Sequence, residues 1–262
     1  LVSVSTNVRL VELYKALIPH GLILKSVPSH PAASVGGCIG YNAHGQNHHR
    51  DGCFGDHVVS LKLFHPSYGE ILLNKDSNTE LFNLTIGGLG LTGIITEATI
   101  KIYPAISNQV DVKRQNFNSI REAYELFLEN KGQYDFYHAL FNLNYITQKR
   151  QPGYFEMAKI IDGPVSNERV SCGGINSLHW PVRPNVFGSS IMRSIVNLYF
   201  RKKSTIPNET IGLFDFMHPS SKKTFYFSMF GNKGMIEQRN TLYKKAIVEL
   251  AEGEAIDLYS ND

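Results

Sequence analysis

The chain has 262 residues, of which 42% are apolar and 19% charged, and its formal net charge is +3. This composition is ordinary for a globular protein that buries one large or two modest cores. The small net charge gives no support to a nucleic-acid function, and the apolar runs are too short to predict a membrane-spanning helix.

The first residues alternate like a strand and carry no signal-peptide pattern. We therefore expect a location in the cytoplasm or at the periphery of a membrane, and further sequence before Leu1. The three cysteines, Cys38, Cys53 and Cys172, are far apart and odd in number, which predicts reduced thiols.

The first hundred residues mix helical and strand patterns. Apolar spacing predicts a helix over 8–20, capped by Thr6 or Asn7 and ended by Gly21. An extended segment over 22–27 follows, and two prolines then lead into a glycine-rich stretch.

Beyond that stretch, strands over 58–64 and 70–73 predict a hairpin. Ser77 and Glu80 form a Ser-x-x-Glu capping box, which predicts a short helix over 77–82. The β-branched run over 94–103 predicts a strand ended by Pro104, and we expect a domain boundary there.

The second part has mixed order without strict alternation, which favours an α+β fold with an antiparallel sheet. A second capping box, Ser119 with Glu122, predicts a helix over 119–130. The remaining expected elements are strands over 134–143, 154–160, 211–217 and 224–230, and helices over 187–200 and 240–251.

Two glycine clusters carry the functional signal, one within residues 34–49 and the other over 87–93. Glycine lets backbone amides approach a ligand closely, which suits a large phosphate-bearing cofactor. Gly88-x-Gly90-x-x-Gly93 matches the dinucleotide fingerprint on paper, but the β-branched residues after Gly93 predict a strand where that fingerprint needs a helix. A nicotinamide-type Rossmann fold is therefore disfavoured.

Several histidines lie near the first cluster. Their spacing, together with that of Cys38 and Cys53, matches no standard zinc pattern, so we predict no metal site. His44 stands beside Gly45 at the mouth of the glycine loop, where an imidazole can contact a ring system or accept a proton.

These motifs resemble a known family. Val35-Gly36-Gly37, the run His44-Gly45-Gln46-Asn47-His48-His49, and Gly87-Gly88 through Gly93-Ile94-Ile95 are similar to the FAD-linked oxidoreductases of the vanillyl-alcohol oxidase superfamily. The likeness is strongest to the decaprenylphosphoryl-β-D-ribose oxidase branch and more distant to aldonolactone oxidases.

The resemblance implies a PCMH-type FAD-binding domain over 1–104, a substrate or cap domain over 105–252, and a return segment toward the flavin over 253–262. FAD would be held without a covalent bond. The residues implied for FAD are Ser29, Ser34, Val35, Gly36 and Gly37 near the pyrophosphate, Tyr41, Asn42, Ala43, His44 and Gly45 along the flavin, and Gly93 and Ile95 near the ribose and adenine.

The implied reaction is hydride transfer from a hydroxyl-bearing carbon of a sugar, polyol or polyprenyl-phosphoryl sugar to flavin N5. The candidate catalytic residues are His44, Gln46, His218 and Asn261. A reductase partner is a further expectation from this branch.

Two positions depart from the branch. Gln46 replaces the lysine of a His-Gly-Lys-Asn motif, and Asn261 replaces the lysine of a terminal Lys-Asp. Each change removes a cation that could stabilise negative charge or bind a phosphate. They motivate the alternative hypothesis of a non-catalytic FAD-binding remnant. The family also has a first FAD subdomain that has no counterpart in this sequence, and the similarity is interrupted near residues 238–240. We therefore expect a longer parent protein.

Overall fold

A computed structural model describes residues 1–142, 145, 150–162 and 189–218. The chain divides into two compact units, of which the first comprises Leu1–Val110 with residues 160–162 and 211–218 of the described part. The second comprises the described residues between 111 and 159 and between 189 and 210.

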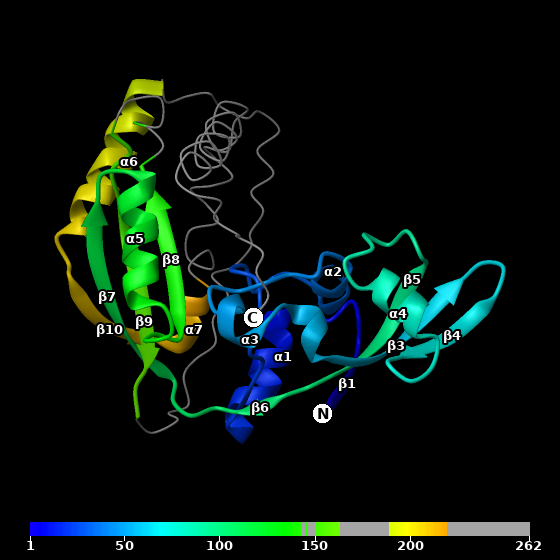
Figure 1. The fold of residues 1–262 in the computed structure, drawn as a ribbon. Helices are drawn as coiled ribbons and strands as arrows, with labels where there is room; N and C mark the ends of the chain where they lie inside the picture. The colour runs from blue at the N-terminus through cyan, green and yellow to red at the C-terminus, as the bar shows by residue number, and fades with distance from the viewer. Residues whose placement is uncertain (143–144, 146–149, 163–188, 219–262) are drawn as a thin grey trace. The chain divides into compact units, whose positions relative to one another are not determined.

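The first unit is built on an antiparallel sheet of order β1-β5-β3-β4 (Figure 1). Its strands are β1 (Val2–Ser5), β5 (Ile94–Ile100), β3 (Val58–His65) and β4 (Gly69–Asn74). β3 and β4 form the predicted hairpin, in which Leu61 faces Leu73 and Leu63 faces Ile71. A two-stranded ladder joins β2 (Leu22–Ile23) to β6 (Tyr103–Pro104).

The first unit also contains short helices. They are α1 (Leu10–Leu17), α2 (Val35–Gly40), α3 (His48–Asp51), α4 (Thr79–Thr85) and α7 (Leu213–Met217), with 3-10 turns over Ile18–His20 and Phe54–His57. The core packs Leu10, Leu13 and Tyr14 of α1 with apolar residues of β3, β4 and β5. This burial supplies the main stabilisation of the unit.

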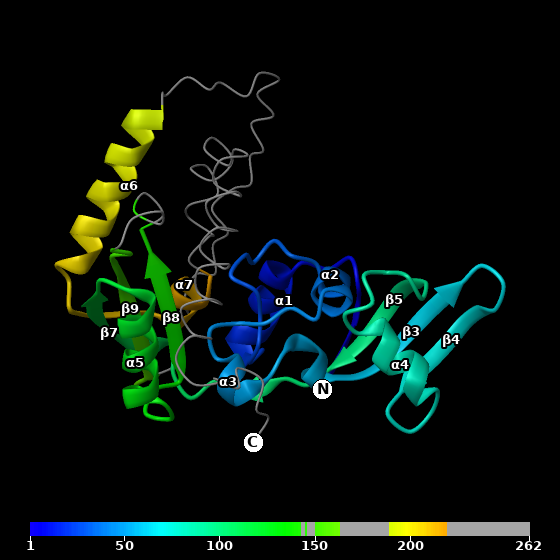
Figure 2. The same ribbon diagram turned by 45° about the horizontal axis from the view of Figure 1, so that its top comes forward.

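The second unit is a four-stranded sheet of order β10-β7-β9-β8. Its elements are β7 (Gln109–Phe117), α5 (Ile120–Asn130), β8 (Phe136–Phe141), β9 (Gly153–Ile160), α6 (Ser189–Ser204) and β10 (Asn208–Gly212). α5 packs on the face that carries Phe155 and Met157. Neighbouring residues of a strand point to opposite faces, so Tyr154, which hydrogen-bonds Tyr199 of α6, places that helix on the other face (Figure 2).

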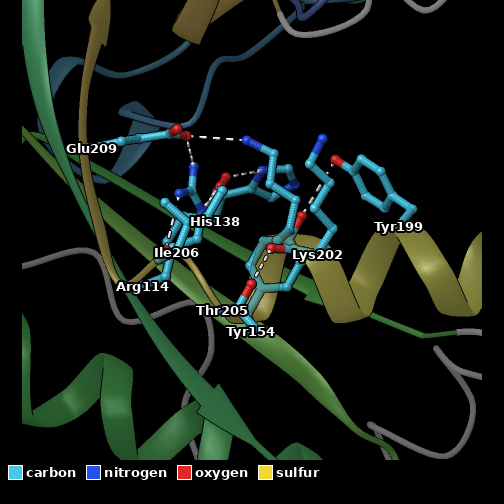
Figure 3. Close-up of polar contacts among 10 residues, drawn as sticks. Arg114, His138, Tyr154, Tyr199, Lys202, Thr205, Ile206 and Glu209 are labelled. Carbon is cyan, nitrogen blue, oxygen red and sulfur yellow. Dashed lines mark hydrogen bonds and ion pairs between the residues drawn. The ribbon is translucent and has the colours of Figure 1, made fainter.

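The face next to α6 buries an arginine. Arg114 of β7 is 3% exposed, donates from Nε to Glu156 at 2.6 Å, and also pairs with Glu209. Lys203 of α6 reaches Glu209 at 3.1 Å, and His138 lies 3.8 Å from Glu156 (Figure 3). Burial alone would lower the pKa of Arg114, but the two carboxylates outweigh it and the pKa is raised. A buried charge needs such partners.

Three predictions about elements need correction. Residues 211–217 do not form a strand: β10 ends at Gly212 and α7 follows, because Phe214 packs edge-on against Tyr14, with ring centroids 5.4 Å apart. A short apolar run is ambiguous between strand and helix, and here tertiary packing decides.

The other two corrections concern helix starts. α1 begins after Arg9, not after Thr6 or Asn7, and Glu12 accepts a hydrogen bond from the Arg9 backbone N–H. α4 begins after Asn78, whose left-handed φ of 56° replaces the expected cap at Ser77. The elements expected over 224–230 and 240–251 lie outside the described residues.

Candidate functional site

The two glycine clusters, about fifty residues apart in sequence, lie against each other. The N–H of Gly87 donates to the carbonyl of Ile39 at 2.9 Å, and the N–H of Leu89 donates to that of Gly40 at 2.9 Å. The first cluster forms α2, a helix of six residues capped by Ser34, whose Oγ accepts from the Gly37 N–H at 3.1 Å. The structure therefore joins the two clusters on one side of the first unit.

The amides at the start of α2 already have partners within the chain. Val35 donates to the carbonyl of Val8 and Gly36 donates to that of Thr6. A Cβ on Gly36 would lie 3.0 Å from Thr6 Cβ. The glycine at this position thus serves close packing between α2 and the turn after β1.

The outward surface of the two clusters fits an organic cofactor. Gly40 and Gly90 have open space above Cα, since a Cβ there would meet no atom within 4 Å. Three large apolar side chains around them, Tyr41, Leu89 and Leu91, are 76%, 66% and 89% exposed. Exposed apolar groups gathered beside open backbone are typical of a binding surface, and a long ring-bearing molecule such as FAD suits it.

Asn42 and Ala43 fix the turn that leads from α2 to His44. Asn42 has a left-handed φ of 44°, and its Oδ1 accepts from the Gly55 N–H at 2.9 Å. Ala43 donates to the carbonyl of Cys38 and accepts from the Phe54 N–H. This turn is held by the backbone from both sides.

His44 is exposed and lies next to a second imidazole. The Nδ1 atoms of His44 and His48 lie 3.3 and 3.2 Å from the same oxygen, the carbonyl of Gly45. Their ring centroids are 5.1 Å apart. A carbonyl oxygen only accepts, so each Nδ1 carries the proton in this arrangement and each Nε2 is left as an acceptor.

Gly93 directly precedes β5, and Ile95 is the second residue of that strand. Gly93 has a φ of 141°, and a Cβ there would lie 2.7 Å from the Phe64 carbonyl, so this position requires glycine. The carbonyl of Ile95 accepts from Thr6 Oγ1 at 2.5 Å. The strand after Gly93 confirms that the Rossmann context is absent here.

His218 is buried, with no exposed surface, at the end of α7. Its ring lies 5.4 Å from that of Tyr14 and 4.7 Å from that of Phe214. Burial lowers its pKa to about 4, an effect that the nearby backbone of Pro28 and Ser29 only partly offsets. His218 thus lies beside Ser29, another predicted site residue, while Asn261 lies outside the described residues.

Asn47 and Asp51 lie behind His44 and had no role predicted from the sequence. Asn47 is 2% exposed, and its amide reaches the carboxylate of Asp51 at 2.8 Å. Their i, i+4 spacing is the signal that could have paired them, since it places two side chains on one helix face.

Neither described cysteine has the lowered pKa of a reactive thiol. Cys38 and Cys53 are free thiols, and burial raises the pKa of Cys38 to about 12. Within the described ranges, no group of three or more histidine, cysteine or acidic side chains could hold a metal ion. In the same part of the chain, no helix combines the length and apolar character needed to cross a bilayer.

Comparison with known proteins agrees with this geometry. Residues 1–73 match the family model described as FAD binding domain. The chain is 28% identical over 262 residues to decaprenylphosphoryl-beta-D-ribose oxidase of Mycolicibacterium smegmatis, an alignment that covers 95% of this chain and 56% of that protein.

Two further relatives match part of the chain. L-galactono-1,4-lactone dehydrogenase 1, mitochondrial, of Oryza sativa subsp. japonica is 33% identical over 123 residues, covering 44% of this chain and 21% of that protein. D-arabinono-1,4-lactone oxidase of Eremothecium gossypii is 29% identical over 124 residues, covering 47% and 23%.

The chain thus spans about half the length of the first relative and less than a quarter of the other two. The match to the FAD binding domain includes the first glycine cluster, where the geometry also suits FAD. Residues 1–73 thus match an FAD binding domain, and the chain is similar to oxidoreductases of the vanillyl-alcohol oxidase (PCMH-type FAD-binding) superfamily.

Proposed function

We propose that the protein containing this chain is an FAD-dependent oxidoreductase that oxidises a secondary alcohol of a sugar or polyprenyl-phosphoryl sugar. The observation that supports this most is the hydrogen-bonded pairing of α2 with the 87–90 loop, which leaves open backbone and exposed apolar side chains on one surface. The names of the relatives support a sugar-like substrate.

Bound FAD would accept a hydride from the hydroxyl-bearing carbon. The chain's contribution is to bind and orient both molecules and to manage the hydroxyl proton. Residues 34–45 and 87–95 would hold the cofactor. His44 would take the proton at Nε2, the nitrogen left as acceptor when Nδ1 bonds to the Gly45 carbonyl.

The carboxamide of Gln46 would hydrogen-bond the substrate, where a cation would have favoured a phosphate. Because Gln46 is neutral, an unphosphorylated sugar or polyol is the first substrate class to try. A reductase that acts on the oxidised product is a partner to seek with the complete protein.

The experiment that tests this proposal is an absorbance titration of the complete purified protein with FAD, followed by anaerobic addition of sugars, aldonolactones and polyprenyl-phosphoryl sugars. Stoichiometric flavin binding and bleaching by one of these classes is the expected result. A protein that cannot be loaded with FAD would overturn the proposal.

A second function has its own support in the loss of a cation at Gln46. In that case the protein binds FAD without turnover. The same titration separates the two functions, since a binding-only protein takes up FAD and stays oxidised with every substrate. A Gln46→Lys variant that then becomes reducible would identify this position as the cause.

A further inference from the structure

Asp51, at the end of α3, is a buried carboxylate that gathers several donors. Its side chain is 5% exposed and lies 3.3 Å from Lys25 Nζ and 2.7 Å from the guanidinium of Arg50. Burial alone would raise its pKa, but the hydrogen bonds from Arg50, Asn47 and Lys25 outweigh burial and the pKa is lowered. Asp51 is therefore a fixed anion behind the loop that carries His44.

Asn47 connects this anion to the loop. Its Nδ2 donates to Asp51 Oδ2 at 2.8 Å and to the carbonyl of Lys25 at 3.0 Å. An amide nitrogen has two hydrogens, so both are used and the orientation of the side chain is set. The other end of the amide, Oδ1, faces Gly45, where a Cβ would come within 2.6 Å of it.

Gly45 in turn provides the carbonyl that accepts a hydrogen bond from the imidazole of His44. Its Cα is enclosed between Asn47 Oδ1 and the carbonyl of Val27, which a Cβ would approach at 3.0 Å. With the peptide confined in this way, the Gly45 carbonyl accepts from the Nδ1 atoms of His44 and His48. The tautomer of His44 thus depends on where this one oxygen lies.

We propose that Asp51 is a positioning residue for His44. Acting through Asn47, its carboxylate holds Gly45 so that the Gly45 carbonyl keeps the proton of His44 on Nδ1 and leaves Nε2 as the acceptor toward the substrate. A histidine whose second nitrogen is fixed by a hydrogen bond is held in one tautomer and one orientation. This inference rests on the proposed function for the role of Nε2, but not for the tautomer itself.

The test is the tautomer of His44 in the complete protein carrying Asp51→Asn. Nitrogen-resolved NMR of histidine-labelled protein above the imidazole pKa distinguishes Nδ1–H from Nε2–H, and a His44→Gln variant assigns the signal. We expect Nδ1–H in the unmodified protein and a shift to a mixture or to Nε2–H in Asp51→Asn. The rate of anaerobic flavin reduction should fall at least about tenfold, at unchanged FAD content.

Asp56→Asn is the matched control. It removes the same charge from a carboxylate five residues along the chain, which caps the Cys53 N–H at 2.7 Å. We expect it to leave the His44 tautomer unchanged. If Asp51→Asn does not fold, Asn47→Ser removes the same link without removing a charge and should shift the tautomer likewise.

Two results would overturn the inference. One is a folded Asp51→Asn or Asn47→Ser protein in which His44 keeps its proton on Nδ1. The other is an equal tautomer shift in Asp56→Asn, which would mean that removing either carboxylate disturbs the structure around His44 non-specifically. Failure of the proposed function is distinguishable, because a protein that binds no FAD still reports the tautomer by NMR.

Discussion

Among single residues, two glycines in the same segment differ in the space that surrounds their Cα atoms. A Cβ at Gly45 would lie 2.6 Å from Asn47 Oδ1, whereas a Cβ at Gly40 would meet nothing within 4 Å. Gly45 is thus enclosed by the protein itself. Gly40, on the surface that would meet the cofactor, is open.

We predict that Gly45→Ala destabilises the protein by about 1–3 kcal/mol, because the side chain of Asn47 cannot withdraw without losing its hydrogen bonds. Gly40→Ala should leave the apoprotein as stable or slightly more stable, since alanine is favoured over glycine in a helix, but should weaken FAD binding at least about tenfold. Urea unfolding and FAD titration measure both effects. Unchanged FAD affinity in Gly40→Ala would show that the cofactor does not approach this face.

His218 gives a prediction about pH. Its pKa is lowered to about 4 by burial in the folded protein, below the ordinary value of 6.5. Between these pH values the unfolded chain binds the proton and the folded protein does not. The free energy of unfolding is therefore not reduced by His218 above about pH 6.5, and it declines as the pH falls toward 4. The full loss is about 3 kcal/mol.

Replacing His218 by Phe should flatten this part of the stability curve, measured by urea unfolding from pH 4 to 7. His57, whose pKa burial also lowers, will leave a residual slope of the same sign. Identical slopes in the two proteins would contradict the prediction. The burial of His218 could not be predicted from the sequence, because a His-Pro pair is also common in exposed turns.

At the scale of elements, two identical sequence signals have different outcomes. Ser119 and Glu122 form a working cap, with Ser119 Oγ accepting from the Glu122 N–H at 3.1 Å. Ser77 and Glu80 have the same spacing, but there the Ser77 backbone N–H donates to Asn74 Oδ1 and α4 starts after Asn78. The capping box is a local pattern, and the preceding hairpin decides whether the chain can use it.

We therefore expect Ser119→Ala to cost about 1 kcal/mol through loss of the cap on α5. Ser77→Ala should change the unfolding free energy by less than about 0.5 kcal/mol, as for an ordinary exposed position. Thermal or chemical denaturation of the two variants side by side makes the comparison. Equal costs would mean that the side chain of Ser77 caps α4 after all.

Local sequence patterns predict part of the fold. The β3–β4 hairpin, α1, α5 and the strand after Gly93 follow from local periodicity and turn residues, and these predictions are confirmed. α2 and α7 were missed as helices because one is rich in glycine and the other alternates phenylalanine with polar residues. Both are short and depend on contacts with Thr6 and Tyr14, which are distant in sequence.

The candidate site was predictable in the same uneven way. Its glycine clusters were visible in the sequence, as was His44. The arrangement of Asn47, Asp51 and Gly45 was not, because buried polar networks depend on three-dimensional packing that periodicity does not encode.

At the scale of the whole molecule, bound FAD should stabilise the protein by mass action. A ligand that binds only the folded state at one hundred times its Kd adds about 2.7 kcal/mol. We predict a higher unfolding temperature with FAD than with the same concentration of ADP, because the flavin ring adds contacts that ADP lacks. Thermal melts followed by circular dichroism test this, and an equal effect of both compounds would restrict recognition to the adenine half.

The pairing of β1 with β5 has a consequence for how the first unit forms. Val2 faces Ile100 and Ser5 faces Glu97 across the ladder, so the strands that frame the site come from opposite ends of a hundred-residue segment. Closing so long a loop costs conformational entropy. Native contacts between residues so far apart in sequence are associated with folding in milliseconds to seconds. A chain emerging from the ribosome would therefore remain without a cofactor surface until β5 is out. FAD would then select chains that have already folded this segment, and could not template its early steps.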